Sequence, residues 1–266
     1  MKISTWNVNS LAVRLPQVID WLTANPVDVL CLQELKLSDE KYPVKEIEAA
    51  GYHSAFFGQK TYNGVAILSR IELGQARDVV KNITGFTDEQ SRVIAVTLNT
   101  PESPQGEVRV VNGYFVNGQE PGSEKFAYKI KWLDGLRTAL RAELAAHPRL
   151  VLLGDFNITV DDRDTYDPVA LRETIHHTTE ERQHFQGLIE LGLTDAFRMF
   201  EQLDKSYSWW DYRELGFRRN RGLRIDHILV SEALKPLVKS CVIDKLPRKN
   251  ERPSDHAPVT VEITAN

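Results

Sequence analysis

Polar residues that can bind metal ions or move protons follow apolar segments at several places in the chain. The clearest case is VLLGDFNIT (151–159), where apolar residues lead into Gly154, Asp155 and Asn157. A short apolar run ended by glycine is typical of a buried strand reaching the edge of a sheet. Side chains two apart on an extended segment share a side, so Asp155 and Asn157 are expected to project together. Taken alone, the pattern also fits an ordinary turn.

The same arrangement recurs at other predicted strand ends. These carry Asn7, Glu34, Tyr114, Asp155 with Asn157, Asp226, and Asp255 with His256. Each position alone fits a turn, a cap or a core aromatic, but no local explanation accounts for the recurrence. Because a sheet brings strand ends to one rim, where α/β folds usually bind ligands, we expect one polar site there.

An arginine-rich segment stands out in a chain whose net charge is −4. Residues 213–224, RELGFRRNRGLR, contain five arginines and one glutamate, a net charge of +4, which leaves −8 for the remainder. Such a segment can bind phosphates although the whole protein is acidic. A solvated loop is the alternative explanation.

The elements that must position these residues follow from the hydrophobic pattern. Helical spacing predicts helices over 14–25, 124–147 and 178–192, and the prolines and glycine of 100–107 predict a hairpin connection. Strands are predicted over 2–8, 27–33, 53–58, 64–69, 93–99, 108–115, 149–155, 224–231, 241–246 and 258–264.

Strand pairs followed by helices occur twice, and no low-complexity linker divides the chain. We therefore predict a single α/β domain over residues 1–266, with two mixed β-sheets packed face to face and helices outside. The composition, 42% hydrophobic and 26% charged, is typical of a soluble globular protein. No signal peptide or membrane span is evident, and Cys31 and Cys241 are expected to be buried thiols. These features predict a cytoplasmic protein with no membrane partner.

The sequence resembles the exonuclease III branch of the endonuclease/exonuclease/phosphatase family over nearly its whole length. The shared segments are WNVNS, DVLCLQELK, GVAILSR, VNGYF, GDFNI, ERQHFQGLIELGLTDAFR, SWWDYR, NRGLRIDHILVS and RPSDHAPV. GDFN with SDHAPV is specific to the superfamily, while SWWDYR and NRGLRIDHIL favour the DNA repair branch over relatives that cut lipid or inositol phosphates. The resemblance implies a four-layered α/β sandwich. It also implies a metal-dependent hydrolase of the exodeoxyribonuclease III type, with abasic-site (AP) endonuclease, 3′–5′ exonuclease and 3′-phosphatase or 3′-phosphodiesterase activity on duplex DNA.

The residue types suit such a reaction, which needs neutralised phosphate charge and an activated water. Glu34, with no basic partner adjacent in sequence and assisted by Asn7, offers the oxygen ligands that Mg²⁺ prefers, and Mn²⁺ is the alternative. The resemblance implies metal-site positions at Asn7, Glu34, Asp155, Asn157, Asp255 and His256.

The catalytic set implied by the resemblance is Tyr114, Asp155, Asn157, Asp226 and His256. His256 can donate to a phosphate oxygen, with Asp226 or Asp255 fixing its tautomer and charge. Asp155 can take a proton from the attacking water, although the sequence leaves open whether Asp155 or the Asp–His pair activates it. Tyr114 can act as a donor or as a phenolate.

The resemblance also implies a DNA-binding surface. Trp209 and Leu223 match positions that wall a pocket for a sugar turned out of the duplex, and core packing is their alternative. The arginines expected to meet DNA phosphates without reading sequence are Arg218, Arg219, Arg221 and Arg224. The expected partner is double-stranded DNA with abasic sites or with blocked or recessed 3′ ends, bound by a monomer.

His176 lies where many relatives have small residues or cysteine. An imidazole there is expected to narrow the pocket for an abasic sugar, which would make the protein a 3′-end-processing member with weak abasic-site incision. A more remote alternative is a non-catalytic DNA-binding protein of the same fold, although no acid and no histidine of the set is missing.

Overall fold

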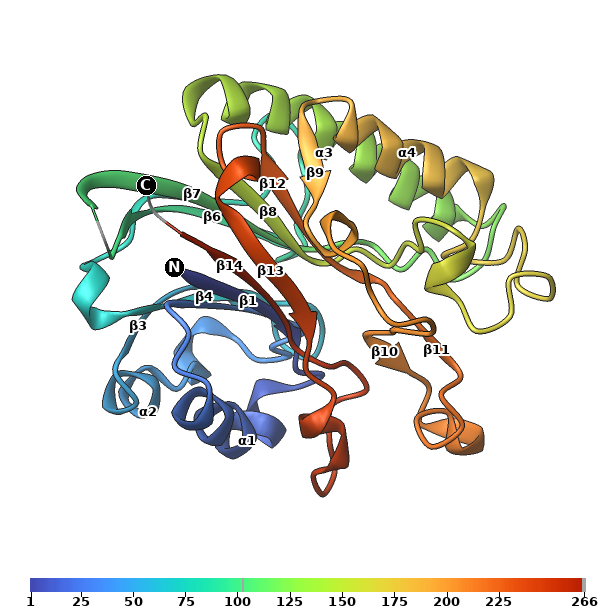
Figure 1. The fold of residues 1–266 in the computed structure, drawn as a ribbon, viewed down its shortest axis with the longest axis horizontal. Coiled ribbons are helices and arrows are strands. Elements are labelled where there is room, and N and C mark those ends of the chain that lie inside the picture. The colour runs from blue at the N-terminus through green and yellow to red at the C-terminus, as the bar shows by residue number, and fades with distance from the viewer. Residues whose placement is uncertain (102, 265–266) are drawn as a thin grey trace.

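The computed structural model of the chain describes residues 1–101 and 103–264. Two six-stranded mixed sheets form its inner layers (Figure 1). The first sheet has the order β13-β14-β1-β2-β4-β3. It consists of β1 (Lys2–Asn7), β2 (Val29–Gln33), β3 (Tyr52–Phe57), β4 (Val65–Arg70), β13 (Val238–Ile243) and β14 (Val259–Ile263).

The second sheet has the order β5-β6-β7-β8-β12-β9. Its strands are β5 (Arg77–Lys81), β6 (Val93–Thr100), β7 (Ser103–Tyr114), β8 (Leu150–Asp155), β9 (Leu193–Asp195) and β12 (Asp226–Ser231). A two-stranded ribbon of β10 (Trp209–Trp210) and β11 (Gly222–Leu223) lies beyond the sheets, where it helps to wall a pocket described below. Short 3₁₀ helices occupy connections at Asp39–Lys41, Ile71–Leu73, Asp162–Asp164, Phe197–Met199, Arg213–Leu215, Lys235–Leu237 and Leu246–Lys249.

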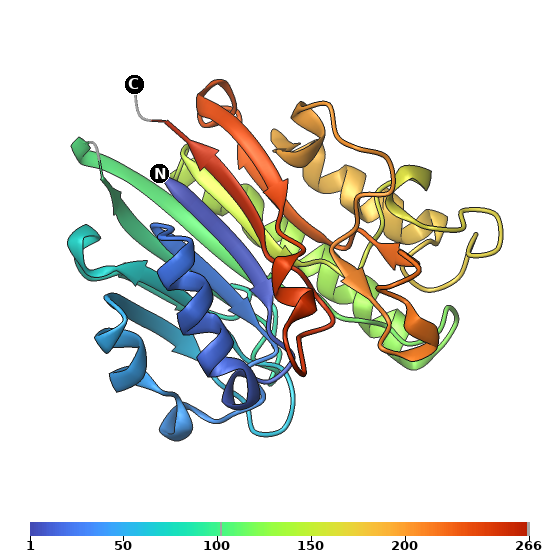
Figure 2. The same cartoon turned by 60° about the horizontal axis from the view of Figure 1, so that its bottom comes forward.

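Helices cover the outer face of each sheet (Figures 1 and 2). The first sheet is covered by α1 (Leu11–Ala24) and α2 (Val44–Ala49), and the second by α3 (Glu124–Ala146) and α4 (Thr179–Ile189). Ser123 caps α3 by accepting from the Phe126 amide at 3.1 Å. Thr178 and Glu181 form a capping box at the start of α4. The layers run helix, sheet, sheet, helix, so the predicted four-layered α/β sandwich is confirmed.

Strand alternation divides the apolar residues between the layers. On β8, Val151 and Leu153 point into the core between the sheets, whereas Leu150 and Leu152 pack under α3 and α4. The core between the sheets becomes polar at one end of the molecule. The inward-facing positions at that end are Asn7, Gln33, Asn112, Tyr114, Asp155 and Asp226.

The predicted helices are confirmed within three residues at each end. The hairpin prediction for 100–107 is also confirmed, since β6 and β7 pair antiparallel, although residue 102 lies outside the described residues. Sequence reasoning missed the short α2, the mostly exposed β5 and the three-residue β9, which carry weak hydrophobic patterns. Cys31 and Cys241 are free and buried, as predicted. Within residues 1–101 and 103–264, no helix is both long enough and apolar enough to cross a membrane.

Candidate active site

Strand register places three functional side chains in a row on the inner face of the second sheet. On the parallel strands β7 and β8, Tyr114 lies opposite Asp155, and on the antiparallel β12, Asp226 lies opposite Asp155 from the other side. Residues directly opposite on neighbouring strands project to the same face. Gly154 permits this approach, because a Cβ there would come within 1.9 Å of the Gly113 carbonyl oxygen.

The first sheet contributes Asn7 and Glu34, at the adjacent ends of the parallel strands β1 and β2. Asn7 Nδ2 donates to Glu34 Oε1 and to Asp155 Oδ2, each at 2.9 Å, and so links the two sheets. Its Oδ1 accepts from the Asn9 amide at 2.9 Å. In this arrangement Asn7 orients both carboxylates through its nitrogen rather than presenting an oxygen to a metal ion.

His256 completes the cluster from the segment before β14. Its Nδ1 donates to Asp226 Oδ2 at 2.8 Å, and its Nε2 lies 3.5 Å from Asp155 Oδ2. Burial works to lower the pKa of His256, but the Asp226 and Asp155 carboxylates outweigh it and raise that pKa to about 10. Asp226 is therefore the partner that fixes the tautomer and positive charge of His256.

The other two groups of the row also have shifted pKa values. Burial raises the pKa of Asp155 to about 7, against the opposing effect of the His256 charge. Burial, with the neighbouring Glu34 and Asp155 carboxylates, raises the pKa of Tyr114 well above its usual value. The Tyr114 hydroxyl is thus kept protonated and can donate a hydrogen bond. Of the two predicted roles, donor and phenolate, the raised pKa favours the donor.

Two of the predicted residues are placed differently from the sequence expectation. Asp255 points its carboxylate away from the cluster, where it accepts from Trp209 Nε1 at 2.9 Å and from Asn9 Nδ2 at 3.2 Å. Asn157 lies beyond the end of β8 with φ of 51°, so strand alternation does not set its direction. Its amide N–H donates to Asp155 Oδ1 at 3.0 Å, and its Nδ2 donates to the Phe115 carbonyl at 3.0 Å.

A metal ion fits beside Glu34 and Asp155, which form a compact cluster with His256, whereas the cationic His256 ring has no free lone pair for a metal ion. One ligand atom from each of these residues lies within 4.8 Å of the others. The carboxylate oxygens of Glu34 and Asp155 are the hard donors that Mg²⁺ and Mn²⁺ take. Lys36, which the sequence reasoning overlooked, lies 3.1 Å from Glu34 Oε2. No basic residue is adjacent to Glu34 in the sequence, but the lysine two positions later in QELK pairs with it in the structure.

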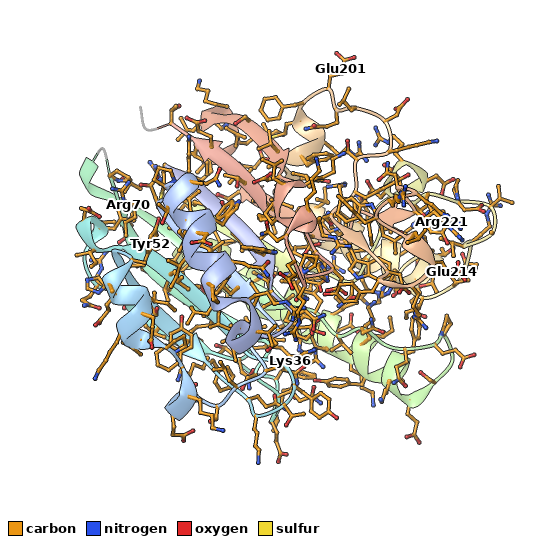
Figure 3. The ribbon with its side chains drawn as sticks, turned by 90° about the horizontal axis from the view of Figure 1, so that it is seen from below. Lys36, Tyr52, Arg70, Glu201, Glu214 and Arg221 are labelled. Atoms are coloured by element: carbon orange, nitrogen blue, oxygen red, sulfur yellow. The ribbon has the colours of Figure 1, made fainter. Side chains whose placement is uncertain are left out.

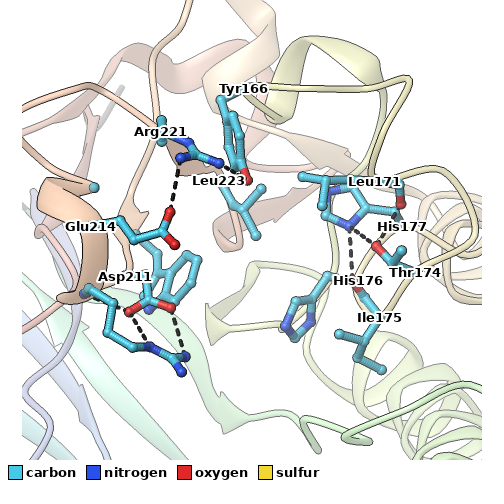
Figure 4. Close-up of a pocket in the computed structure, with 13 residues that line it drawn as sticks. Tyr166, Leu171, Thr174, Ile175, His176, His177, Asp211, Glu214, Arg221 and Leu223 are labelled. Atoms are coloured by element: carbon cyan, nitrogen blue, oxygen red, sulfur yellow. Dashed lines mark hydrogen bonds and ion pairs between the residues drawn. The ribbon is translucent and has the colours of Figure 1, made fainter.

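A pocket of about 480 Å³ (Figure 4) has a volume within the range of about 300–1,000 Å³ typical of ligand sites. It lies beside the cluster, because Trp209, the strand partner of His256, lines it. Trp209, Leu223 and His176 line it together. The Trp209 backbone pairs with His256 on one side and with Leu223 on the other. His176 Nδ1 donates to the Asn157 carbonyl at 2.7 Å, and burial lowers the pKa of His176 to about 3, so its ring is neutral.

The four arginines of the predicted DNA surface fall into three environments. Arg218 and Arg219 are exposed, and neither has an acidic partner in the described part of the chain. Arg221 pairs with Glu214 at 3.1 Å, and both lie at the opposite end of the molecule from Arg70 (Figure 3).

Arg224 was wrongly predicted to contact DNA. Its side chain is 1% exposed and is held by Asp164 at 2.7 Å and Asp195 at 2.8 Å. A guanidinium that is buried and paired with two carboxylates has no free donor face for a phosphate, so Arg224 is a structural residue. Sequence alone did not separate it from its exposed neighbours, because all four lie in one basic segment.

Comparison with known proteins gives a consistent result. The family described as "Endonuclease/Exonuclease/phosphatase family" matches residues 4–256. Exodeoxyribonuclease III of Haemophilus influenzae is 37% identical over 99% of this chain and 100% of its own length. DNA repair nuclease APEX1 of Danio rerio is 31% identical over 98% of this chain and 81% of its own.

Solved structures of similar proteins lead to the same family. The 3′ phosphatase NExo from Neisseria, bound to a product DNA hairpin, superimposes with a TM-score of 0.94 and 49% identity over 100% of both chains. An AP endonuclease from Archaeoglobus fulgidus gives a TM-score of 0.92 and 32% identity, again over 100% of both chains. The chain therefore belongs to the endonuclease/exonuclease/phosphatase family, and its resemblance to exonuclease III is confirmed.

Proposed function

We propose that this protein is a metal-dependent DNA repair nuclease that hydrolyses phosphate esters at abasic sites and 3′ ends of duplex DNA. One observation carries the proposal: a cationic His256, an Asp155 with a raised pKa and a protonated Tyr114 converge beside Glu34, and Trp209, the strand partner of His256, lines the adjacent pocket. The similarity to exodeoxyribonuclease III, APEX1 and NExo supports DNA as the substrate. We also propose that residues 1–266 form one domain, which the core shared by the two sheets supports, and that the protein acts as a monomer in the cytoplasm.

Each side chain has a defined task in this reaction. Glu34 and Asp155 would hold Mg²⁺ or Mn²⁺, which when bound supplies positive charge against the phosphate. Asp155 is placed to accept a proton from the attacking water. His256 and Tyr114 donate hydrogen bonds to phosphate oxygens as negative charge develops on them. Asn157 keeps the Asp155 carboxylate oriented through its backbone N–H.

Three duplexes test this proposal, carrying an abasic site, a 3′-phosphate or a recessed 3′ end, each incubated with Mg²⁺ and with EDTA. We expect turnover that EDTA abolishes. Binding of all three duplexes without turnover would instead identify a non-catalytic DNA-binding protein. Release of phosphate from inositol phosphates but not from DNA would identify a lipid or inositol phosphatase.

A second candidate, a nuclease specialised for 3′ ends, is favoured by His176. Its ring lines the same pocket as Trp209 and is fixed by its bond to the Asn157 carbonyl, so it would occupy volume that a flipped abasic sugar needs. The NExo structures, named for 3′ phosphatase and 3′–5′ exonuclease activity, are 49% and 50% identical to this chain, against 32% for the AP endonuclease.

Replacing His176 tests the specialisation. His176 has φ of 72°, a conformation that glycine adopts without strain, so His176→Gly removes the ring and keeps the loop geometry. Relief of a steric block of about 3 kcal/mol would raise abasic-site incision on the order of a hundredfold relative to 3′-phosphate release. His176→Ser serves as the second variant. A parent protein that incises abasic sites as readily as it trims 3′ ends would contradict the specialisation and leave the nuclease proposal standing.

A further inference from the structure

The pocket beside the active site extends well beyond the residues that border His256. A row of paired residues leads away from the catalytic cluster: His256 pairs with Trp209, Trp209 with Leu223, and Leu223 with Thr165. Adjacent strands lie about 5 Å apart, so this row spans about 15 Å. All of Trp209, Leu223, Tyr166 and Arg221 line the pocket. Trp209 pairs with His256, whereas Tyr166 follows Thr165 at the far end of the row, so the part of the pocket at Tyr166 and Arg221 is called the outer end.

At the outer end of the pocket, an arginine lies over a tyrosine ring. The guanidinium carbon of Arg221 lies 4.9 Å from the centre of the Tyr166 ring, and its Nη2 is 3.3 Å from the Tyr166 hydroxyl. Glu214 fixes the other side of the guanidinium through Nη1 at 3.1 Å. An arginine held against a tyrosine in this way presents planar surfaces, and aromatic rings and guanidinium planes are the surfaces on which unpaired bases stack.

The charge of the outer end is balanced. Arg221 is paired with Glu214, and the neighbouring Arg213 is paired with Asp211 at 2.9 Å. A subsite for a phosphate would offer cations without acidic partners, as Arg218 and Arg219 do outside the pocket. The outer end therefore suits an uncharged, planar group.

We infer that Tyr166 and Arg221 form a subsite for the nucleobase of the 3′-terminal nucleotide that the enzyme removes. The inference rests on the proposed nuclease function and assigns a ligand to the part of the pocket that an abasic sugar does not reach. Hydrolysis adds a water oxygen to phosphorus and a proton to the departing 3′-oxygen of the preceding nucleotide. The released 5′-nucleotide would leave with its phosphate at His256 and its base at Tyr166.

This subsite would also let the enzyme distinguish terminal nucleotides from internal abasic sites. An internal abasic sugar is tethered by phosphates on both sides and cannot shift past the His176 ring. A terminal nucleotide is tethered by its 5′-phosphate alone, so its base can reach the outer end. A 3′-phosphate has no base or sugar to enter the pocket, so its release should not depend on Tyr166.

The test uses the full chain and one duplex with three different 3′ ends: a nucleotide, a deoxyribose residue without a base, and a phosphate. We expect Tyr166→Ala to lower kcat/KM for removing the nucleotide roughly tenfold, the typical effect of losing one stacking contact. Removal of the baseless sugar and of the phosphate should change less than about twofold. Tyr166→Phe, which keeps the ring, should restore nucleotide removal.

Arg221→Ala should produce the same selective loss, and Arg70→Ala is its matched control. Arg70 also forms a solvent-exposed ion pair, with Glu72 at 3.4 Å, and the exposed fractions of the two pairs are nearly equal, at 38% and 70% against 41% and 73%. Because Arg70 lies far from the pocket (Figure 3), its loss should leave all three rates unchanged.

Two outcomes would overturn the subsite. The first is an equal fall in kcat/KM for all three 3′ ends in a Tyr166→Ala protein whose melting temperature matches that of the parent. The second is an unchanged kcat/KM for removal of the terminal nucleotide. Inhibition gives an independent check, since 5′-dAMP should inhibit the parent's phosphate release more strongly than that of Tyr166→Ala, and equal inhibition also overturns the inference. A parent that releases no phosphate at all would refute the proposed function itself, whereas failure of the subsite leaves phosphate release intact.

Discussion

The catalytic cluster and the neighbouring pocket are built in different ways. The cluster draws Asn7, Tyr114, Asp155 and Asp226 from strands of both sheets, so their positions follow from strand register. The pocket draws its lining from loops and from strands of two residues, and two of its residues, His176 and Glu214, have positive φ. With the proposed function, the sheets would fix the chemistry, while substrate choice would lie in loops whose residues can change without disturbing the core.

Buried ion pairs nevertheless hold the loops around the pocket to the second sheet and its helices. Arg224 ties the Asp164 loop to Asp195 on β9. Lys129 on α3 forms a buried ion pair with Glu181 on α4 and donates to the Asn157 carbonyl at 2.8 Å. In the cluster the polar groups face the substrate, whereas here they hold loops against the helices and the sheet. Substitutions should therefore affect turnover in the first region and stability or specificity in the second.

The largest effect is expected from Glu34→Ala in the cluster. Losing this metal ligand should lower turnover by at least about a thousandfold, since metal charge stabilises the transition state by several kcal/mol. DNA affinity should change little. Calorimetric titration with Mn²⁺ measures the loss directly, and an affinity equal to the parent's would remove Glu34 from the metal site.

The second-largest effect on turnover is expected from Asp226→Asn. The variant loses the carboxylate that keeps His256 in one tautomer and positively charged, and turnover should fall on the order of a hundredfold to ten-thousandfold. Because Asp226 raises the pKa of His256, its loss should move the alkaline limb of the pH–rate profile to lower pH. An alkaline limb that stays in place would show that the His256 charge is not required.

In the pocket region, Arg224→Leu should affect stability rather than chemistry. Removing one partner of a buried ion pair costs about 3–5 kcal/mol, measured as the free energy of unfolding in urea. Burial works to raise the pKa of Asp164, but Arg224 outweighs it and holds that pKa below its usual value. The stability from this pair is therefore present above the unfolded pKa of about 3.9 and is lost as pH falls, so parent and variant should converge in acid.

Arg163→Ala is the matched control for this loss. Arg163 forms an exposed pair with Asp161 at 2.6 Å, and exposed pairs contribute at most about 1 kcal/mol. Weakened DNA binding by Arg224→Leu with unchanged stability would restore the original assignment of Arg224 to the DNA surface.

The smallest effect concerns the exposed arginines. Replacing Arg218 and Arg219 with alanine should weaken duplex binding equally for all sequences and lower the slope of log affinity against log salt by about 0.9 for each arginine. Glu34→Ala should keep the parent slope. Fluorescence anisotropy at several salt concentrations measures both, and an unchanged slope for the arginine variants would mean that their loop faces away from DNA.

Much of this arrangement was accessible from the sequence. Alternating hydrophobicity predicted most strands, and the recurrence of polar residues at strand ends predicted one site containing Glu34, Asp155, Asp226 and His256. These predictions hold because periodicity and strand ends are local properties of the chain. The elements α2, β5 and β9 were not predicted, because their hydrophobic patterns are weak. Their positions depend on packing against neighbouring elements rather than on local periodicity.

Contacts between distant segments were decided only by the tertiary structure. Asp226 rather than Asp255 partners His256, because β12 pairs with β8 while Asp255 faces Trp209. Arg224 and Arg218 look alike in one basic segment, but only the first meets two buried carboxylates. Sequence thus determined which chemical groups this protein has and that they gather at one rim. Burial and pairing, which depend on segments far apart in the chain, decided which of those groups is charged, which faces the substrate and which only supports the fold.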